Sequence, residues 1–223
     1  PNPTLLKPRV TPLAAAVAAA FCLFSMPLQA ASVPGDGPRA RKPAVLDTVE
    51  VAGEQVEGYR AERSSTATRT DTPLLDIPQS ISVITQQLIR DQAMQGMADV
   101  VRYVPGMGMA QGEGNRDNPV VRGSSSTADL FIDGMRDDVQ YFRDLYNIDR
   151  VEALKGPNAM IFGRGGSGGV LNRVSKQVSW EAARELRVEL GSWDKLRATA
   201  DFNQAINDQA AFRVSALAEN TDS

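Results

Sequence analysis

The sequence contains no histidine and a single cysteine, Cys22. These two shortages exclude Cys/His metal sites, Cys/His nucleophilic pairs, Ser-His-Asp triads and histidine acid–base chemistry. The sequence also lacks a G-x-x-x-x-G-K-[ST] phosphate loop, a G-x-S-x-G elbow and a complete calcium loop. The net charge of −3 argues against a nucleic-acid-binding protein. We therefore expect neither an enzyme nor a protein-bound metal.

The first residues have the pattern of a secretory leader. Lys7 and Arg9 precede an uncharged run over residues 13–26, and residues 28–30 end in a small side chain suited to cleavage. The run is shorter than the roughly 20 residues that a transmembrane helix needs. Residues 1–31 are therefore expected to be a signal peptide, and the mature chain would form no disulfide.

Residues 32–72 predict a flexible N-terminal segment, with a polar linker over residues 54–72. Two valines within it alternate with polar neighbours, which is typical of a short strand. Nothing nearby offers this strand a partner, so pairing with the sheet edge of another protein is one interpretation. An ordinary first strand is the alternative. The strand consists of Asp47, Thr48, Val49, Glu50 and Val51.

Apolar residues recur every three or four positions over residues 86–104 and predict an amphipathic helix. Gly96 is expected to divide it into two short helices, and Pro105 to follow the second. A strand with Ile81 and Val83 on one face precedes it. The expected apolar stripe consists of Ile89, Ala93, Met97, Val100, Val101 and Val104.

The centre of the chain alternates short strands with long polar loops. Strands are expected over residues 119–122 and 130–132, which would pair with each other, and Asp133-Gly134 is a strong turn signal. The glycine-rich loop over residues 107–118 and the loop over residues 135–148 would then converge at one end of a small mixed sheet. That end would carry Arg116, Arg136, Tyr141 and Arg143.

Two further strands surround a run of glycines. Residues 150–155 predict a short, half-buried strand that Gly156-Pro157 ends, and residues 170–174 predict the next strand. The glycines between them satisfy G-x-G-x-x-G, but a dinucleotide site would need a helix after them. We expect them to allow positive φ angles and close packing instead. They are Gly163, Gly165 and Gly168.

After Trp180, apolar and polar residues alternate in three segments of about ten residues, as in strands of a membrane β-barrel whose apolar side chains face lipid. Trp193 suits an aromatic girdle at the membrane interface. An amphipathic sheet in a soluble sandwich has the same pattern, and the export signal favours the barrel. The apolar residues are Leu186, Val188, Leu190, Leu196, Ala198, Ala200, Phe202, Phe212, Val214, Ala216 and Ala218.

Four of these blocks, in this order, closely resemble the plug domain of TonB-dependent outer-membrane receptors, with the siderophore receptors as the nearest match. They read N-P-V-V-R-G from Asn118, L-F-I-D-G from Leu130, R-V-E-A-L-K-G-P from Arg150 and G-R-G-G-S-G-G-V-L-N-R-V from Gly163. The resemblance implies an α+β plug, a small mixed sheet with short helices. The first strands of an antiparallel transmembrane β-barrel of about 22 strands would follow.

The resemblance also implies the domain boundaries. Residues 1–31 are the signal peptide, residues 32–72 the flexible segment with a TonB box at residues 47–51, and residues 73–178 the plug. Residues 179–223 begin the barrel, which we expect to be truncated. The box would bind TonB, which works with ExbB and ExbD.

Charged residues inside or beside the strands predict ion pairs within the plug and between the plug and the barrel. Ordinary cores avoid unpaired charges, whereas large outer-membrane barrels have polar lumens. The candidates for plug–barrel pairs are Arg122, Glu152 and Arg164, of which Arg122 and Arg164 match family positions. The alternative is the solvated surface of a free-standing domain.

The function that the resemblance implies is import of a ferric siderophore across the outer membrane, without catalysis. Ferric catecholate complexes are anionic and bulky, so Arg116, Arg136 and Arg143 would attract them while Tyr141 offers a flat apolar face. The siderophore would hold the iron, no cofactor would be bound covalently, and membrane lipid would surround the barrel. Haem, cobalamin or another large nutrient is the alternative within this architecture. Outside it, the alternative is a binding or adhesion protein with a soluble β domain.

Overall fold

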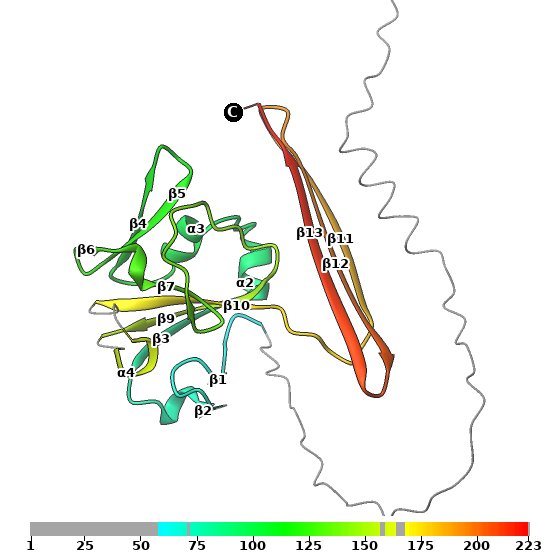
Figure 1. Cartoon of the computed structure of the whole chain (residues 1–223). Coiled ribbons are helices and arrows are strands. Elements are labelled where there is room, and N and C mark those ends of the chain that lie inside the picture. The colour runs from blue at the N-terminus through cyan, green and yellow to red at the C-terminus, as the bar shows by residue number, and fades with distance from the viewer. Residues whose placement is uncertain (1–57, 71, 157–158, 164–167, 223) are drawn as a thin grey trace, which may run out of the picture. The chain divides into compact units, whose positions relative to one another are not determined.

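The computed structural model describes the chain from residue 58 onwards, with short gaps (Figure 1). The described residues are 58–70, 72–156, 159–163 and 168–222. The expected signal peptide, residues 1–31, and the expected TonB box, residues 47–51, lie outside them, as does Arg164.

The chain forms two compact units. Of the described residues, those over 58–186 and 199–217 belong to a large unit, and those over 187–198 and 218–222 belong to a smaller one. Among the helices in the described part of the chain, none has the length and apolar character needed to cross a membrane.

A five-stranded mixed sheet is the centre of the large unit, with the strand order β3-β9-β10-β7-β8 (Figure 1). Strand β9 pairs antiparallel with β3 and β10, and β10 pairs parallel with β7. The bounds are Ser80–Thr85 for β3, Leu130–Ile132 for β7, Met135–Arg136 for β8, Ile148–Lys155 for β9 and Gly169–Ser175 for β10.

Strand β9 corrects the expectation of a short, half-buried strand over residues 150–155. It has eight residues, and all but Asp149 and Lys155 are buried. The reason is that both of its edges are paired and both of its faces are covered. Val151 and Ala153 belong to one apolar cluster, and Leu154 belongs to the other, as expected for alternating side chains of a central strand.

Two short helices, α2 over Gln86–Asp91 and α3 over Met97–Val101, confirm the predicted division at Gly96, which is the N-cap of α3. All residues of the expected stripe except Ala93 are buried. Ala93 is exposed because α2 has already ended, and its φ of 48° turns the chain so that Met94 enters the core instead.

The glycine-rich stretch after the helices forms a hairpin, not the expected loop. Strands β4 (Met107–Gly112), β5 (Arg116–Val121) and β6 (Ser124–Ser125) make a three-stranded sheet in the order β4-β5-β6. The turn is tight because Glu113 and Gly114 both have positive φ. The expected pairing of residues 119–122 with residues 130–132 is therefore wrong.

Strand β7 pairs with β10 and β8 instead. The predicted Asp133-Gly134 turn joins β7 to β8, and both of its residues have positive φ, as a type I′ hairpin turn requires. The shorter elements of this region are the 3₁₀-helix η2 (Thr127–Asp129) and the helix α4 (Ala159–Phe162), which precedes the glycine run. Strand β10 follows that run, as predicted.

The described residues before β3 differ from the polar linker predicted over residues 54–72. Strand β1 (Arg63–Ser64) pairs with β2 (Thr72–Pro73), and the 3₁₀-helix η1 (Leu74–Asp76) follows. We call residues 58–70 the N-terminal strap. The strap packs on the sheet through Ser64, which bonds Glu152, and through Ala67, which belongs to the apolar cluster of Leu154 and Val170.

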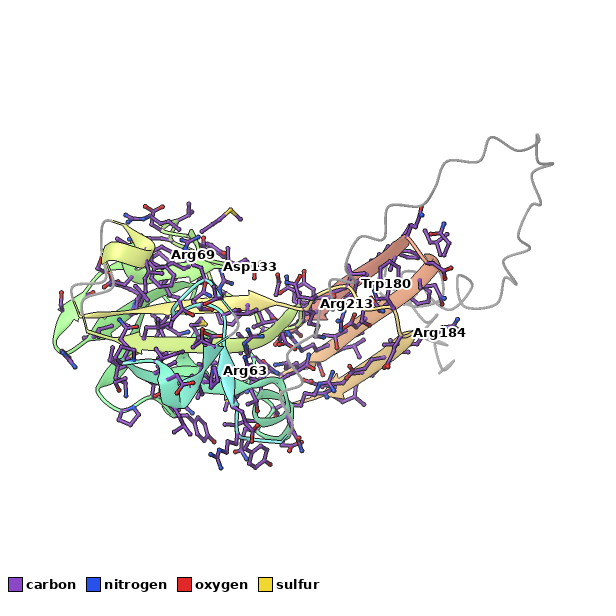
Figure 2. All side chains as sticks on the ribbon, turned by 90° about the horizontal axis from the view of Figure 1, so that it is seen from below. Arg63, Arg69, Asp133, Trp180, Arg184 and Arg213 are labelled. Carbon is purple, nitrogen blue, oxygen red and sulfur yellow. The ribbon has the colours of Figure 1, made fainter. Side chains whose placement is uncertain are left out.

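The sheet of β11 (Ala183–Leu190), β12 (Leu196–Asn207) and β13 (Ala210–Asn220) has the three predicted segments in sequential order (Figure 1). Several of its apolar side chains are exposed and several of its polar side chains are buried, which is the reverse of a sheet in a soluble protein. Val188 and Val214 are 54% and 55% exposed, whereas Asp201 and Asn203 are buried. Arg213, labelled in Figure 2, donates to both carboxylate oxygens of Asp201 over 2.8 and 2.7 Å.

Glu152 lies fully buried at the centre of β9. Its Oε1 accepts a hydrogen bond from Arg150 Nε (2.7 Å), and its Oε2 accepts one from Ser64 Oγ (2.6 Å). Both oxygens are therefore engaged within the large unit.

We expect Glu152→Gln to lower the free energy of unfolding of this sheet by about 3 kcal/mol, because Arg150 would stay buried without this carboxylate and keep its ion pair with the partly exposed Asp149. Native-state hydrogen exchange of β9 amides in the full-length protein measures this. Glu113→Gln is the matched control, because Glu113 is exposed and its pair with Arg116 is worth about 1 kcal/mol at most. Equal losses in the two variants would contradict a buried ion pair.

Candidate functional site

Asp117 joins the β4–β5 hairpin to the loop after β8. It is fully buried, and its Oδ2 accepts a hydrogen bond from the backbone N–H of Arg143 over 2.7 Å. Its own N–H donates to the carbonyl of Tyr141 over 3.1 Å. Beside it, Arg116 Nη1 donates to Gln140 Oε1 over 3.0 Å. The β4–β5 hairpin and the loop after β8, which were expected to converge, are therefore hydrogen-bonded to each other.

Arg143 stabilises the conformation of the loop after β8 through hydrogen bonds to the loop's own carbonyl groups. Its side chain is fully buried, and it donates to the carbonyl oxygens of Asp137 (2.8 Å), Val139 (2.5 Å) and Tyr141 (3.0 Å). Its Nε also donates to Asp137 Oδ2 over 3.0 Å. The guanidinium carbon lies 4.2 Å from the centroid of the Tyr141 ring. The sequence placed Arg143 among ligand-binding residues, whereas the structure uses most of its donors to close the loop.

A single carboxylate oxygen, Asp137 Oδ2, ties this loop to the sheet. Besides the bond from Arg143, it accepts hydrogen bonds from the Tyr141 hydroxyl over 2.7 Å and from Arg173 Nη2. Arg173 lies in β10 and is buried, so its charge needs a partner in the interior. The ion pairs predicted for charges within the strands include one for Arg173, whereas sequence reasoning missed its partner Asp137. An arginine between Asn172 and Val174 in a strand was the available signal.

The outer side of the loop combines cationic and apolar side chains. Arg136 is exposed, with its guanidinium carbon 5.8 Å from the centroid of the Phe131 ring. Tyr141 and Phe142 are each about two-fifths exposed. Phe142 also packs against Gly96, where an added Cβ would lie 2.8 Å from its ring. We call the set of Met135, Arg136, Val139, Tyr141 and Phe142, with Arg116 beside it, the loop surface.

The three candidates for pairing with a barrel wall have different surroundings. Arg122 is exposed, and its φ of 51° places it in the tight turn after β5. Glu152 is paired with Arg150 inside the large unit, so its ion pair here is internal. Arg164 lies outside the described residues. Across the described ranges, no group of three or more histidine, cysteine or acidic residues is arranged to hold a metal ion.

We expect Arg143→Lys to loosen the loop, because an ammonium cannot reach three carbonyls and a carboxylate at the same time. Hydrogen exchange of residues 137–143 in the full-length protein should become on the order of tenfold faster. Arg136→Lys, the same substitution at an exposed position, should leave these rates unchanged. Equal rates in the two variants would show that Arg143 does not organise the loop.

The mixed sheet with two short helices and the hairpin define a plug-type domain. Residues 73–170 match the family model described as TonB-dependent Receptor Plug Domain. The chain belongs to the TonB-dependent receptor family.

Named relatives agree with this assignment. The chain is 34% identical over 180 residues to "Probable TonB-dependent siderophore receptor PiuA" of Acinetobacter baumannii, covering 79% of this chain and 24% of PiuA. It is 32% identical over 180 residues to "Catecholate siderophore receptor Fiu" of Escherichia coli K12, covering 78% and 24%. The chain thus spans about a quarter of the length of these relatives.

Solved structures are similar as well. The crystal structure of PiuA superposes with a TM-score of 0.67 at 34% identity, covering 73% of this chain and 24% of that one. The open form of Fiu superposes with a TM-score of 0.65 at 31% identity, covering 72% and 24%.

Proposed function

We propose that this chain is the N-terminal part of an outer-membrane receptor that imports a ferric siderophore into the periplasm. The observation that carries the proposal is the likeness of the plug, in sequence and in fold, to receptors named for siderophores. In this proposal the plug gates the barrel, the siderophore is the ligand that holds the iron, and the receptor catalyses no reaction.

The loop surface is the plug's proposed share of the binding site. Arg116 and Arg136 attract an anionic complex, and the ring of Tyr141 offers a flat contact beside them. All three are at least partly exposed. Arg143 contributes indirectly by holding the loop that carries Tyr141. The rest of the site would come from barrel loops.

We assign β11 to β13 to the start of an antiparallel transmembrane β-barrel of about 22 strands. Exposed apolar side chains and buried polar ones on these strands support lipid on one face and a polar lumen on the other. In this arrangement residues 73–178 form the plug, residues 179–223 begin the barrel, and Arg122 and Arg164 pair with its wall.

The N-terminal region is proposed to connect the plug to its energy source. Residues 1–31 direct export, and residues 47–51 act as the TonB box within the flexible segment of residues 32–72. TonB, driven through ExbB and ExbD, would pair with the box as an added strand.

Uptake of radiolabelled iron as ferric siderophores by cells with the full-length receptor tests this function. We expect receptor-dependent uptake, and binding of the transported complex on the order of tenfold weaker in Arg136→Gln, because a charge-assisted bond is lost. Arg60→Gln, at an exposed position in the N-terminal strap, is the control and should bind normally.

Uptake of haem or cobalamin without ferric siderophores would overturn the leading proposal in favour of its alternative. Another metal chelate is a specific candidate, because the chain is 33% identical over 176 residues to "Metal-pseudopaline receptor CntO" of Pseudomonas aeruginosa.

The membrane assignment makes a separate prediction for two neighbouring residues of β13. Val214→Arg should destabilise the receptor folded in lipid by about 2–4 kcal/mol, because an exposed apolar side chain would become a charge facing lipid. Ser215→Arg, on the opposite face of the strand, should be tolerated. The measurement is the amount of folded full-length receptor in outer-membrane fractions. Equal accumulation of the two variants would contradict a lipid-facing side.

A further inference from the structure

Three consecutive hydroxyl side chains in the N-terminal strap bind polar side chains of the central sheet. Ser64 Oγ donates to Glu152 Oε2 over 2.6 Å, and Ser65 Oγ accepts a hydrogen bond from Arg150 Nη2 over 3.4 Å. Thr66 Oγ1 accepts one from Asn172 Nδ2 over 3.1 Å. Strands β9 and β10 provide these partners. The strap is therefore held by specific polar bonds in addition to apolar contact.

Asn172 differs from Glu152 and Arg150, which bond each other within β9, because its second bond leads to a different segment of the plug. While Nδ2 donates to Thr66 in the strap, Oδ1 accepts a hydrogen bond from the backbone N–H of Gly134 over 3.0 Å. Gly134 belongs to the β7–β8 turn, directly before Met135 of the loop surface. Asn172 itself is buried and lies opposite Glu152 in the β9–β10 register. One side-chain amide thus joins two segments that are 68 residues apart (Gly134 minus Thr66).

The same turn has a second attachment to β10. Asp133, labelled in Figure 2, accepts a hydrogen bond from the backbone N–H of Ser175 over 2.9 Å, and its own N–H donates to the carbonyl of Arg173 over 2.9 Å. Arg173 in turn bonds Asp137 in the loop. Hydrogen bonds and an ion pair therefore connect the turn, β10 and the loop. A shift of the turn would displace the Asn172 side chain, which is bonded to it.

We propose that Asn172 is a positioning residue that couples the loop surface to the N-terminal strap. A displacement of the β7–β8 turn moves the Asn172 amide and weakens its bond to Thr66. Release of the strap loosens the turn in the same way, because coupling between two sites is reciprocal. The coupling needs no ligand to exist. Its use in signalling an occupied binding site rests on the proposed function.

Thr66→Val tests the coupling, because valine keeps the shape of threonine and lacks the hydroxyl that accepts the hydrogen bond from Asn172. Hydrogen exchange is followed in the full-length receptor for residues 58–70 and for residues 130–136. We expect exchange to be roughly two- to tenfold faster in both segments. Thr68→Val is the matched control. The Thr68 hydroxyl bonds Thr70 in the strap and Thr72 in β2, and among the described residues it makes no hydrogen bond to the central sheet, so exchange in residues 130–136 should stay at the wild-type rate.

Faster exchange in the strap alone would overturn the proposal, because Asn172 would then be only a local tether. Unchanged exchange in both segments would overturn it as well. Asn172→Leu removes both bonds at similar volume, and we expect it to accelerate exchange in both segments at least as much as Thr66→Val. An Asn172→Leu variant with wild-type rates would also contradict the proposal.

A second arm separates this inference from the proposed function. The ferric complex of 2,3-dihydroxybenzoate is added as a tris-catecholate probe. We expect it to change strap exchange in the wild type and to change it less in Thr66→Val. If the wild type does not bind the probe, this ferric catecholate is not its ligand, while the comparison without probe still decides the coupling. If the probe binds and changes both proteins equally, the coupling through Asn172 fails.

Discussion

The plug depends on four polar side chains buried on the two faces of strands β9 and β10. Arg150 and Glu152 on β9, and Asn172 and Arg173 on β10, lie where a soluble domain would place aliphatic residues. Such groups contribute little net stability compared with an apolar core, but leaving one unpaired is costly. Each therefore requires a partner at a defined position.

These requirements select the segments that cover the sheet. The partners of Glu152 and Asn172 are hydroxyl groups, which Ser64 and Thr66 provide from the strap. Arg173 selects a carboxylate, and Asp137 provides it from the loop. The strap and the loop are polar in sequence because their partners are polar, and polarity in this protein does not indicate a lack of structure.

This explains which parts of the fold the sequence could predict. The apolar stripe of the helices, the division at Gly96 and the Asp133-Gly134 turn depend on local chemistry, and the structure confirms them. The β4–β5 hairpin and the strap were missed because their glycine and serine residues do not produce the alternation of apolar and polar side chains by which strands are predicted. The pairing of β7 with β10 was missed because it joins residues 41 positions apart (Leu171 minus Leu130).

The candidate site shows the same division between local and distant causes. Arg136 and Tyr141 could be chosen from composition, since exposed arginine and aromatic side chains mark a surface able to bind anions. The internal role of Arg143 could not, because it depends on carbonyl groups that face inward only in the folded loop. An arginine in a polar loop has the same sequence signal whether it binds a ligand or the loop itself.

The polar centre of the plug also suits the surroundings that we propose. In a water-filled barrel lumen, a strap that leaves the sheet would expose Glu152, Arg150 and Asn172 to water, which restores their hydration. An apolar centre would lose about 25 cal/mol for each square ångström uncovered and would resist release more strongly. Buried charges thus lower the cost of partial opening while their paired geometry keeps the closed state unique. The proposed function, in which the plug is closed at rest and opens under a pull on its N-terminus, needs both properties.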